Sequence, residues 1–186
     1  MLTAWGDESG SIPQQDPDSY LISAALIEDN DVPEVRKAIE GIRLGNEPKV
    51  HWHGSNPSRR HELVELVASL PLVGFVVVHM EMGANDRRHR RKCLECLLPN
   101  LDDMSCRHIT LESRGTQDES DRDVLAKFRS RKVITADMRL DHAIGRNEPV
   151  LAVADIVCGA VVQSRVGNRE YLAKLDSSID LRHISS

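Results

Sequence analysis

Asp155 is a carboxylate in an otherwise apolar segment. It lies in residues 150–162, which read VLAVADIVCGAVV and predict a helix that is apolar on nearly every side. Burying a carboxylate is costly unless it is hydrogen-bonded, protonated or bound to a cation. Ala152 and Gly159 flank it on the same helix face and leave room for backbone, a metal ion or a substrate. Asp155 is therefore a candidate catalytic residue, and a structural hydrogen bond to a neighbouring loop is the alternative.

Two further acids stand where predicted strands end. Asp7 ends a strand over residues 2–7, and Glu112 ends a strand over residues 107–112. Ligand sites in α/β sheets usually form at strand ends. The alternatives are a turn aspartate for Asp7 and a surface ion pair with Arg114 for Glu112.

Taken together, Asp7, Glu112 and Asp155 would form a site for a hard cation, either Mg²⁺ or Mn²⁺, beside a substrate phosphate. This chemistry predicts hydrolysis of phosphodiester bonds, in which the cation activates a water and stabilises the leaving oxygen. Asp118 is a candidate extra ligand. The nearby Asp121 and Asp123 fit the first turn of a helix, where acids are favourable.

His51 and His53 share one face of an extended segment that begins at Lys49. Such a pair could bind a metal, contact a phosphate or transfer a proton, and two exposed loop histidines are the alternative. A dense basic run, RRHRRK over residues 87–92, could bind a nucleic-acid backbone or form a solvated helix face. The substrate contacts predicted from these residues are His51, His53, Arg114, Arg87, Arg88, Arg90 and Arg91.

A separate cluster of sulfur and imidazole groups allows a different hypothesis. Cys93 and Cys96 form a single C-x-x-C motif, and Cys106 with His108 could complete four zinc ligands. Cys93 and Cys96 also fit the buried face of a helix. The chain could thus be a zinc-stabilised interaction protein.

The elements that must position these residues form an α/β order. The pattern predicts two strands, two helices, and then strand, helix, strand, helix, strand and helix. The five predicted strands cover residues 2–7, 20–27, 72–80, 107–112 and 132–136. Five helices are predicted. The first begins after a cap at Asp31 and the second after a cap at Asn56. The third covers residues 88–98 and ends near Pro99, the fourth covers residues 121–129, and the fifth covers residues 149–165.

Composition limits the class of protein. A length of 186 residues suits one domain, and the formal net charge of -5 means that any contact with nucleic acid must use a local basic patch. Aromatic residues make up 3% of the chain, so stacking of bases on an aromatic platform is unfavourable. Four cysteines and the lack of a leader pattern predict the cytoplasm, and no apolar run is long enough for a membrane span.

Three motifs in order resemble one family. They are GDESG at residues 6–10, ESRG at residues 112–115 and EPVLAVADIVCGA at residues 148–160, and they resemble the domain-of-unknown-function 3800 family. The family pattern has a glutamine where this chain has Ala152. The resemblance implies an RNase H-like fold with a mixed five-stranded sheet flanked by helices, and nuclease activity.

Carried over by position, the resemblance implies that Asp7, Glu112 and Asp155 are the catalytic acids and the metal ligands. We expect a single RNase H-like domain over residues 1–186, with a core to about residue 165 and a C-terminal extension over residues 166–186. The first hypothesis is a nuclease that depends on Mg²⁺ or Mn²⁺ and acts on DNA or RNA. The alternative is a non-catalytic module of the same fold that binds nucleic acid or protein.

Overall fold

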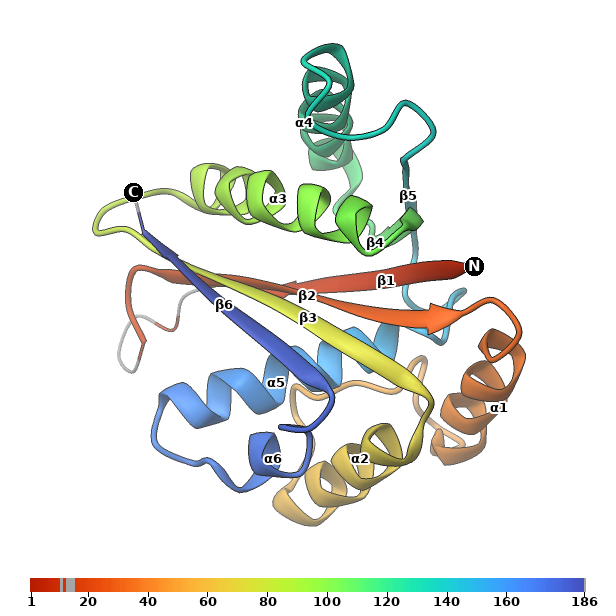
Figure 1. Ribbon diagram of the computed structural model, residues 1–186. Coiled ribbons are helices and arrows are strands. Elements are labelled where there is room, and N and C mark those ends of the chain that lie inside the picture. The colour runs from red at the N-terminus through yellow and green to blue at the C-terminus, as the bar shows by residue number, and fades with distance from the viewer. Residues whose placement is uncertain (11, 13–15, 186) are drawn as a thin grey trace.

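One mixed sheet of six strands forms the centre of the computed structural model, which describes residues 1–10, 12 and 16–185 (Figure 1). The order of strands across the sheet is β5-β4-β1-β2-β3-β6. The strands are β1 (Leu2–Ser9), β2 (Ser19–Glu28), β3 (Leu72–Met80), β4 (Cys106–Glu112), β5 (Arg139–Ala143) and β6 (Ile179–Ser185).

The sheet contains both antiparallel and parallel pairs of strands. β1, β2 and β3 pair antiparallel in sequence order. β4 pairs parallel with β1, β5 pairs parallel with β4, and β6 pairs parallel with β3. Each parallel strand is reached by a crossover that contains helices, as parallel pairing requires. The carboxyl ends of β1, β4 and β5 therefore lie at one edge of the sheet.

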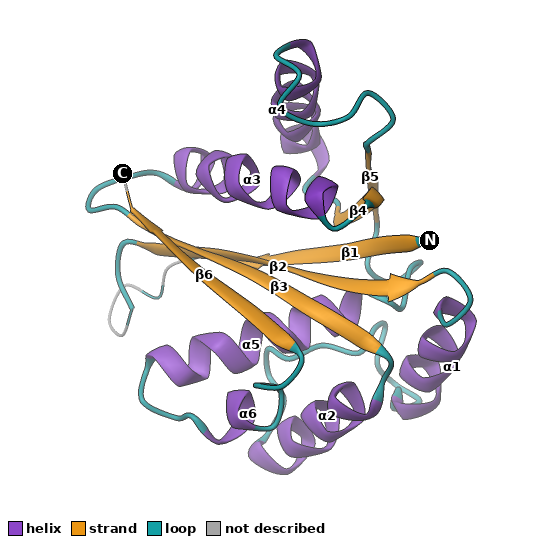
Figure 2. Cartoon of the chain, viewed as in Figure 1, coloured by secondary structure: helices purple, strands orange, loops and turns teal. Residues whose placement is uncertain are grey.

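Helices cover both faces of the sheet (Figure 2). The α3 and α4 helices lie on one face, and α1, α2, α5 and α6 lie on the other. The helices are α1 (Val32–Ile42), α2 (Pro57–Ser69), α3 (Asp86–Asp103), α4 (Asp118–Ser130), α5 (Leu151–Arg165) and α6 (Glu170–Ala173), with a 3-10 turn η1 (Gly115–Gln117) before α4.

Two cores result from this layering. Along β2, Leu21 and Ala25 face the core beneath α5, whereas Ile22 and Ala24 face the core beneath α3. Successive side chains of a strand point to opposite faces, so a strand that is covered on both sides is apolar throughout. No helix in the described part of the chain is long and apolar enough to cross a membrane.

The sixth strand corrects the prediction of a five-stranded sheet. It lies within residues 166–186, where an extension was expected, and it pairs with β3 from Gly74 to Met80. The predicted strand over residues 132–136 is wrong. Lys132 has a positive φ of 56° and begins a turn, and β5 starts later at Arg139. Ile134 is buried without being in a strand, which explains the misleading apolar signal.

The two predicted helix caps differ in the structure, because Asp31 precedes α1 without a capping hydrogen bond from its side chain, whereas Asn56 caps α2. The Asn56 side chain accepts a hydrogen bond from the Arg59 backbone N–H at 2.9 Å, so the predicted cap of α2 is confirmed. The prediction that α3 ends near Pro99 is wrong, because the helix continues to Asp103. Leu101 in this last turn is fully buried, and its packing against the sheet stabilises the helix beyond the proline.

Candidate active site

Two of the predicted acids lie on neighbouring parallel strands. Gly6 of β1 is in register with Leu111 of β4, so Asp7 and Glu112 follow at the same level. A Cβ atom at position 6 would lie 2.6 Å from the Leu111 side chain and 3.0 Å from the Ser23 carbonyl oxygen. Glycine therefore allows β1 to pass close to its neighbours just before Asp7. The sheet thus brings two acids from distant parts of the chain together.

The third acid, Asp155, reaches the same place from α5. The hydroxyl of Ser23 on β2 donates to the Ala154 carbonyl oxygen at 2.7 Å, and the Cys158 thiol donates to the Asp7 carbonyl oxygen at 3.4 Å. These bonds fix α5 against the end of β1 and the middle of β2. A Cβ at Gly159 would lie 2.2 Å from the indole of Trp52, so glycine also lets this ring pack on the helix.

Electrostatic coupling shows that the acids share one environment. Asp7 is 8% exposed, and its burial, followed by the charges of Asp155, Glu8 and Glu112, raises its pKa from an ordinary 3.8 to about 8. A hydrogen bond from the Glu8 backbone N–H to Asp7 Oδ1, at 2.8 Å, acts in the other direction and lowers the pKa of Asp7. The site therefore favours a proton, or another cation, at Asp7 near neutral pH.

Asp155 is held by the segment that carries the predicted histidines. Its Oδ2 accepts from the Trp52 backbone N–H at 2.7 Å and lies 2.6 Å from Nδ1 of His51. The bond to Asp155 raises the pKa of His51, against the effects of burial and of Lys49. When Nδ1 of His51 bonds to Asp155, Nε2 is the ring nitrogen left for another partner. The His51 side chain is 41% exposed. The ring of His53 lies 6.1 Å from that of His51.

Glu112 makes a contact that the sequence did not predict. Both of its carboxylate oxygens accept from Nζ of Lys49, at 2.6 and 2.7 Å. A Cβ at Gly145 would lie 2.5 Å from Glu112 Oε1 and 3.0 Å from Lys49 Nζ, so the backbone of this loop packs closely over the ion pair. Lys49 lies two residues before His51, and its place in the segment of the predicted histidines was the only sequence signal that it could belong to the site.

The donor chemistry fits a hard divalent cation only in part. Asp7 and Asp155 supply buried carboxylate oxygens in a strongly negative environment, which suits Mg²⁺ or Mn²⁺. In the described residues, however, no three His, Cys, Asp or Glu side chains are grouped so that they could hold one ion. Glu112 instead binds the ammonium group of Lys49. It would have to leave Lys49 to complete a three-carboxylate site.

A second polar network lies on the opposite face of the same strand end. Glu8 points away from Asp7, and its carboxylate binds Arg90 at 2.8 Å and Arg114 at 3.0 Å. Arg114 also donates to the Tyr20 hydroxyl at 3.1 Å. Arg90 is 4% exposed and also donates two hydrogen bonds to Asp121, at 2.8 and 2.9 Å. The predicted substrate contact Arg90 is thus a buried structural cation.

The acids of the first turn of α4 belong to this network. Asp121 was expected to favour the helix terminus, but it is buried and also lies 2.9 Å from His142 of β5. Hydrogen bonds from His142 and Arg90 hold its pKa low although burial opposes this. Asp118 accepts from the Ser113 hydroxyl and from the Arg114 backbone N–H, both at 2.7 Å. The structure thus places Asp118 at the start of α4, where it organises the backbone of the turn after β4.

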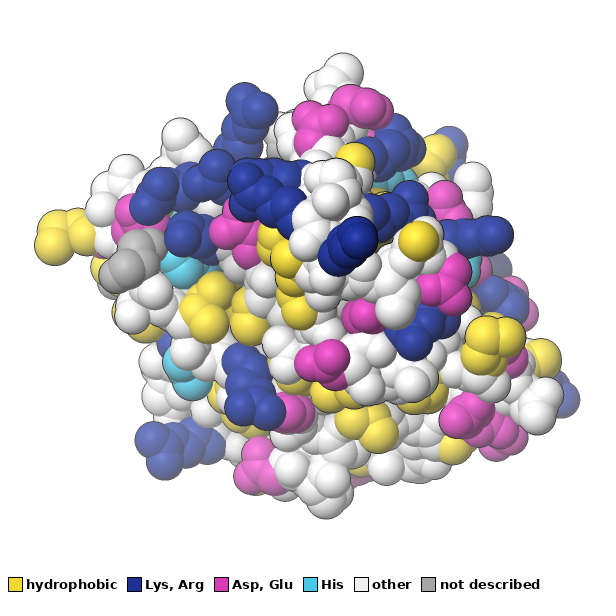
Figure 3. Space-filling view, turned by 45° about the horizontal axis from the view of Figure 1, so that its top comes forward, with side chains coloured by type: hydrophobic (Ala, Val, Ile, Leu, Met, Phe, Trp, Pro, Cys, Tyr) yellow, Lys and Arg dark blue, Asp and Glu magenta, His cyan; other side chains and the backbone are white. Residues whose placement is uncertain are grey.

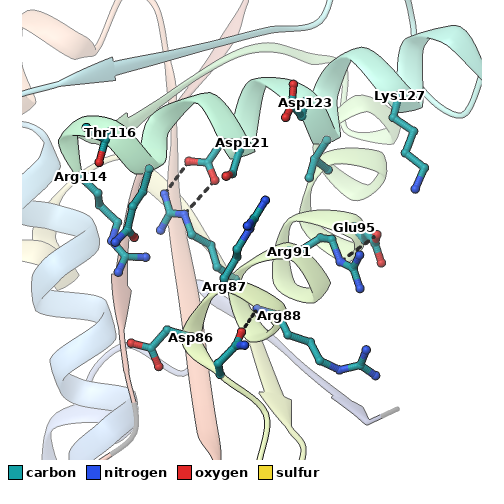
Figure 4. Close-up of a pocket in the computed structure, with 15 residues that line it drawn as sticks. Asp86, Arg87, Arg88, Arg91, Glu95, Arg114, Thr116, Asp121, Asp123 and Lys127 are labelled. Carbon is teal, nitrogen blue, oxygen red and sulfur yellow. Dashed lines mark hydrogen bonds and ion pairs between the residues drawn. The ribbon is translucent and has the colours of Figure 1, made fainter.

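Arginines of the predicted basic run line a cleft of about 720 Å³ between α3 and α4 (Figure 4). Arg87 extends into this space from α3, and Lys127 extends into it from α4. Arg88 binds Glu81 at 2.7 Å, and Arg91 lies 3.8 Å from Glu95. The run is therefore partly a paired helix surface and partly the wall of a cleft.

The four candidate zinc ligands do not meet. The thiol of Cys93 faces the Tyr20 and Val77 carbonyl oxygens inside the core, and the thiol of Cys106 contacts the carbonyl oxygen of His108. The His108 ring instead lies 2.8 Å from Asp141. The zinc hypothesis is therefore wrong for these residues.

The layers, the sheet and the helix on which Asp155 lies define an RNase H-like α/β fold. The chain is similar to a chain of the PCNA:RNase HII complex from Archaeoglobus fulgidus, with a TM-score of 0.53 and 13% identity over 96% of this chain and 90% of that one. It is also similar to ribonuclease H2 from Pyrococcus horikoshii OT3, with a TM-score of 0.59 and 14% identity over 95% and 76% of the two chains.

A mutant of Bst-RNase HIII has a similar fold with a TM-score of 0.50 and 11% identity, over 94% of this chain and 53% of that one. No family model matches the chain, and no curated protein matches its sequence. The predicted RNase H-like fold is confirmed, with six strands in place of five. The resemblance to the domain-of-unknown-function 3800 family stays a prediction.

Proposed function

We propose that this protein is a divalent-metal-dependent nuclease that hydrolyses phosphodiester bonds of DNA or RNA. The observation that carries the proposal is the buried carboxyl group of Asp7, whose pKa is raised to about 8 by burial and by Asp155, Glu8 and Glu112. Buried acids that repel one another are unfavourable for stability, and such clusters are typical of functional sites. The position of Asp7 and Glu112 near the carboxyl ends of β1 and β4, with Asp155 on α5, supports the proposal.

Asp7 and Asp155 would hold Mg²⁺ or Mn²⁺, with Glu112 as the third ligand once it releases Lys49. When bound, the ion supplies an activated water and stabilises the leaving oxygen. The chain's own groups then divide the remaining work. Asp155 orients His51 through Nδ1, so that Nε2 can donate to or accept from a phosphate or a water. Lys49, once released, is a cation within the site that can contact a non-bridging phosphate oxygen.

Further contacts with nucleic acid would come from the neighbours of this cluster. His51 and His53 line a hollow of about 600 Å³ at the start of α2, together with Lys49, whose ammonium group binds Glu112. Arg114 approaches the strand ends from the other face of the sheet and is held there by Glu8. A substrate strand that crosses the end of β1 would thus meet imidazole groups on one side and a guanidinium on the other.

One observation favours the alternative of a module that binds without catalysis. Lys49 neutralises Glu112 at 2.6 Å, and a lysine that never leaves would take the place of a divalent cation at this carboxylate. The two functions differ in whether a divalent ion binds to the folded chain.

Thermal melting with and without Mn²⁺ tests the proposal. An ion at about 100 times its Kd stabilises a folded protein by about 2.7 kcal/mol, which for a chain of this size is a rise in Tm of roughly 5–10 °C. We expect this rise in the wild type and in the exposed control Asp176→Asn, and its loss in Asp155→Asn. A rise that persists in Asp155→Asn would show that the metal binds elsewhere.

Cleavage of labelled single-stranded RNA, duplex DNA, RNA–DNA hybrid and a four-way junction in Mn²⁺ tests the catalytic step. We expect one or more of these substrates to be cut by the wild type and by Asp176→Asn, and by neither Asp7→Asn nor Asp155→Asn. Metal binding without cleavage of any substrate would favour the binding module.

A further inference from the structure

The cleft between α3 and α4 is rich in cations in an acidic chain. Six basic side chains line it, together with four acidic ones, although the whole chain has a formal net charge of -5. Figure 3 shows Lys and Arg side chains gathered on the face that these helices form. A polyanion that is repelled by the chain as a whole would be attracted here.

The acids of the cleft are partly committed to internal partners. Asp121 is bound by Arg90 and His142, and Glu95 lies beside Arg91. Among the residues that the structure describes, Arg87 and Lys127 form no ion pair, and both are exposed. Each extends into the space between the helices from its own side (Figure 4). The cleft thus has two unpaired cations, one from each of the helices that form it.

The base of the cleft is rigid and lies next to the candidate active site. Arg90 is 4% exposed and fixed by Glu8 and Asp121, and Arg114 is fixed by Glu8 and Tyr20. Glu8 directly follows Asp7 on β1, and the two side chains point to opposite faces of the sheet. A strand with its reacting phosphate at Asp7 needs only to cross the end of β1 to enter the cleft.

We propose that this cleft binds the phosphodiester backbone of a nucleic acid, next to the cleavage site and without regard to base sequence. The inference rests on the proposed nuclease function and adds a second binding site on the other face of the sheet. Guanidinium and ammonium groups suit phosphate oxygens. None of the residues that line the cleft is aromatic, so it offers backbone contacts and no stacking platform for bases.

Fluorescence anisotropy without divalent ions tests the proposal. Labelled single-stranded RNA, single-stranded DNA and duplex DNA are titrated with the wild-type protein in EDTA at several salt concentrations. The test variant is the double substitution Arg87→Glu with Lys127→Glu. The matched control is Lys37→Glu with Arg169→Glu, which makes the same charge change at exposed residues on α1 and beside α6.

We expect the cleft variant to bind at least one probe about ten-fold or more weakly than the control variant. The plot of log K against log salt should become shallower by about 0.7 to 0.9 for each phosphate contact that is lost. The probe with the largest loss identifies the kind of strand that enters the cleft. Circular dichroism checks that both variants are folded.

Equal affinities and equal salt slopes of the cleft and control variants on every probe would overturn the proposal. Its failure is distinguishable from failure of the proposed function, because the binding assay contains no divalent ion. A chain without Mn²⁺ stabilisation can still show the cleft effect, and a chain with Mn²⁺ stabilisation can lack it.

Discussion

Replacing Asp7 by asparagine should make the protein more stable near neutral pH. The wild-type carboxyl has an ordinary pKa of 3.8 and a pKa of about 8 in the folded chain. Between these values the unfolded chain has released the proton and the folded chain retains it, so the free energy of unfolding falls as pH rises. Asparagine carries no charge, and its side-chain oxygen can still accept from the Glu8 backbone N–H.

The size of the effect follows from the same two values. One pH unit corresponds to about 1.4 kcal/mol, so the wild type should lose roughly 2–3 kcal/mol of stability at Asp7 between pH 5 and pH 7. The advantage of Asp7→Asn over the wild type should grow by that amount across the window. Urea unfolding at pH 5, 6 and 7 without divalent ions measures it.

The exposed aspartate Asp176 provides the control. Asp176→Asn makes the same chemical change at an exposed position, so the Asp7→Asn trend is compared with the difference that this variant shows at each pH. A difference between Asp7→Asn and wild type that stays constant from pH 5 to pH 7 would refute the reasoning. It would mean that Asp7 is not held among like charges in the folded chain.

Three further predictions concern the neighbours of the site. Lys49→Met frees the carboxylate of Glu112, so it should tighten Mn²⁺ binding about ten-fold in calorimetry, a change of about 1.4 kcal/mol in binding free energy. An unchanged affinity would mean that the ion pair does not compete with the metal. Asp121→Ala should lower the free energy of unfolding by about 1–3 kcal/mol in urea, since it removes two hydrogen bonds from the buried guanidinium of Arg90, which keeps its contact with Glu8, and an unchanged free energy of unfolding would contradict the buried network. Gly159→Ala should cost about 1–3 kcal/mol because its methyl group meets Trp52, whereas Gly41→Ala, with open space around it, should be neutral or stabilising.

The sequence determined the periodic elements and the acids that break their pattern. Asp155 was evident because a carboxylate inside an apolar helix requires a partner, and Asp7 and Glu112 were evident because they stand where the predicted strands end, although β1 continues to Ser9. Asp31 and Asn56 predicted where α1 and α2 begin, although only the Asn56 side chain makes a capping hydrogen bond. These signals are local, since the residues concerned are neighbours along the chain.

Tertiary structure decided which side chains meet. Lys49 contacts Glu112 across 63 residues, and Arg90 contacts Asp121 across 31. It also decided that residues 179–185 form a sixth strand beside β3, and that the turn near Ile134 is not a strand. Pairing partners and charge partners depend on how elements pack, and no local pattern specifies them. The sequence could therefore identify the acids, and only the fold could show that one is bound to a lysine and that a basic cleft lies behind them.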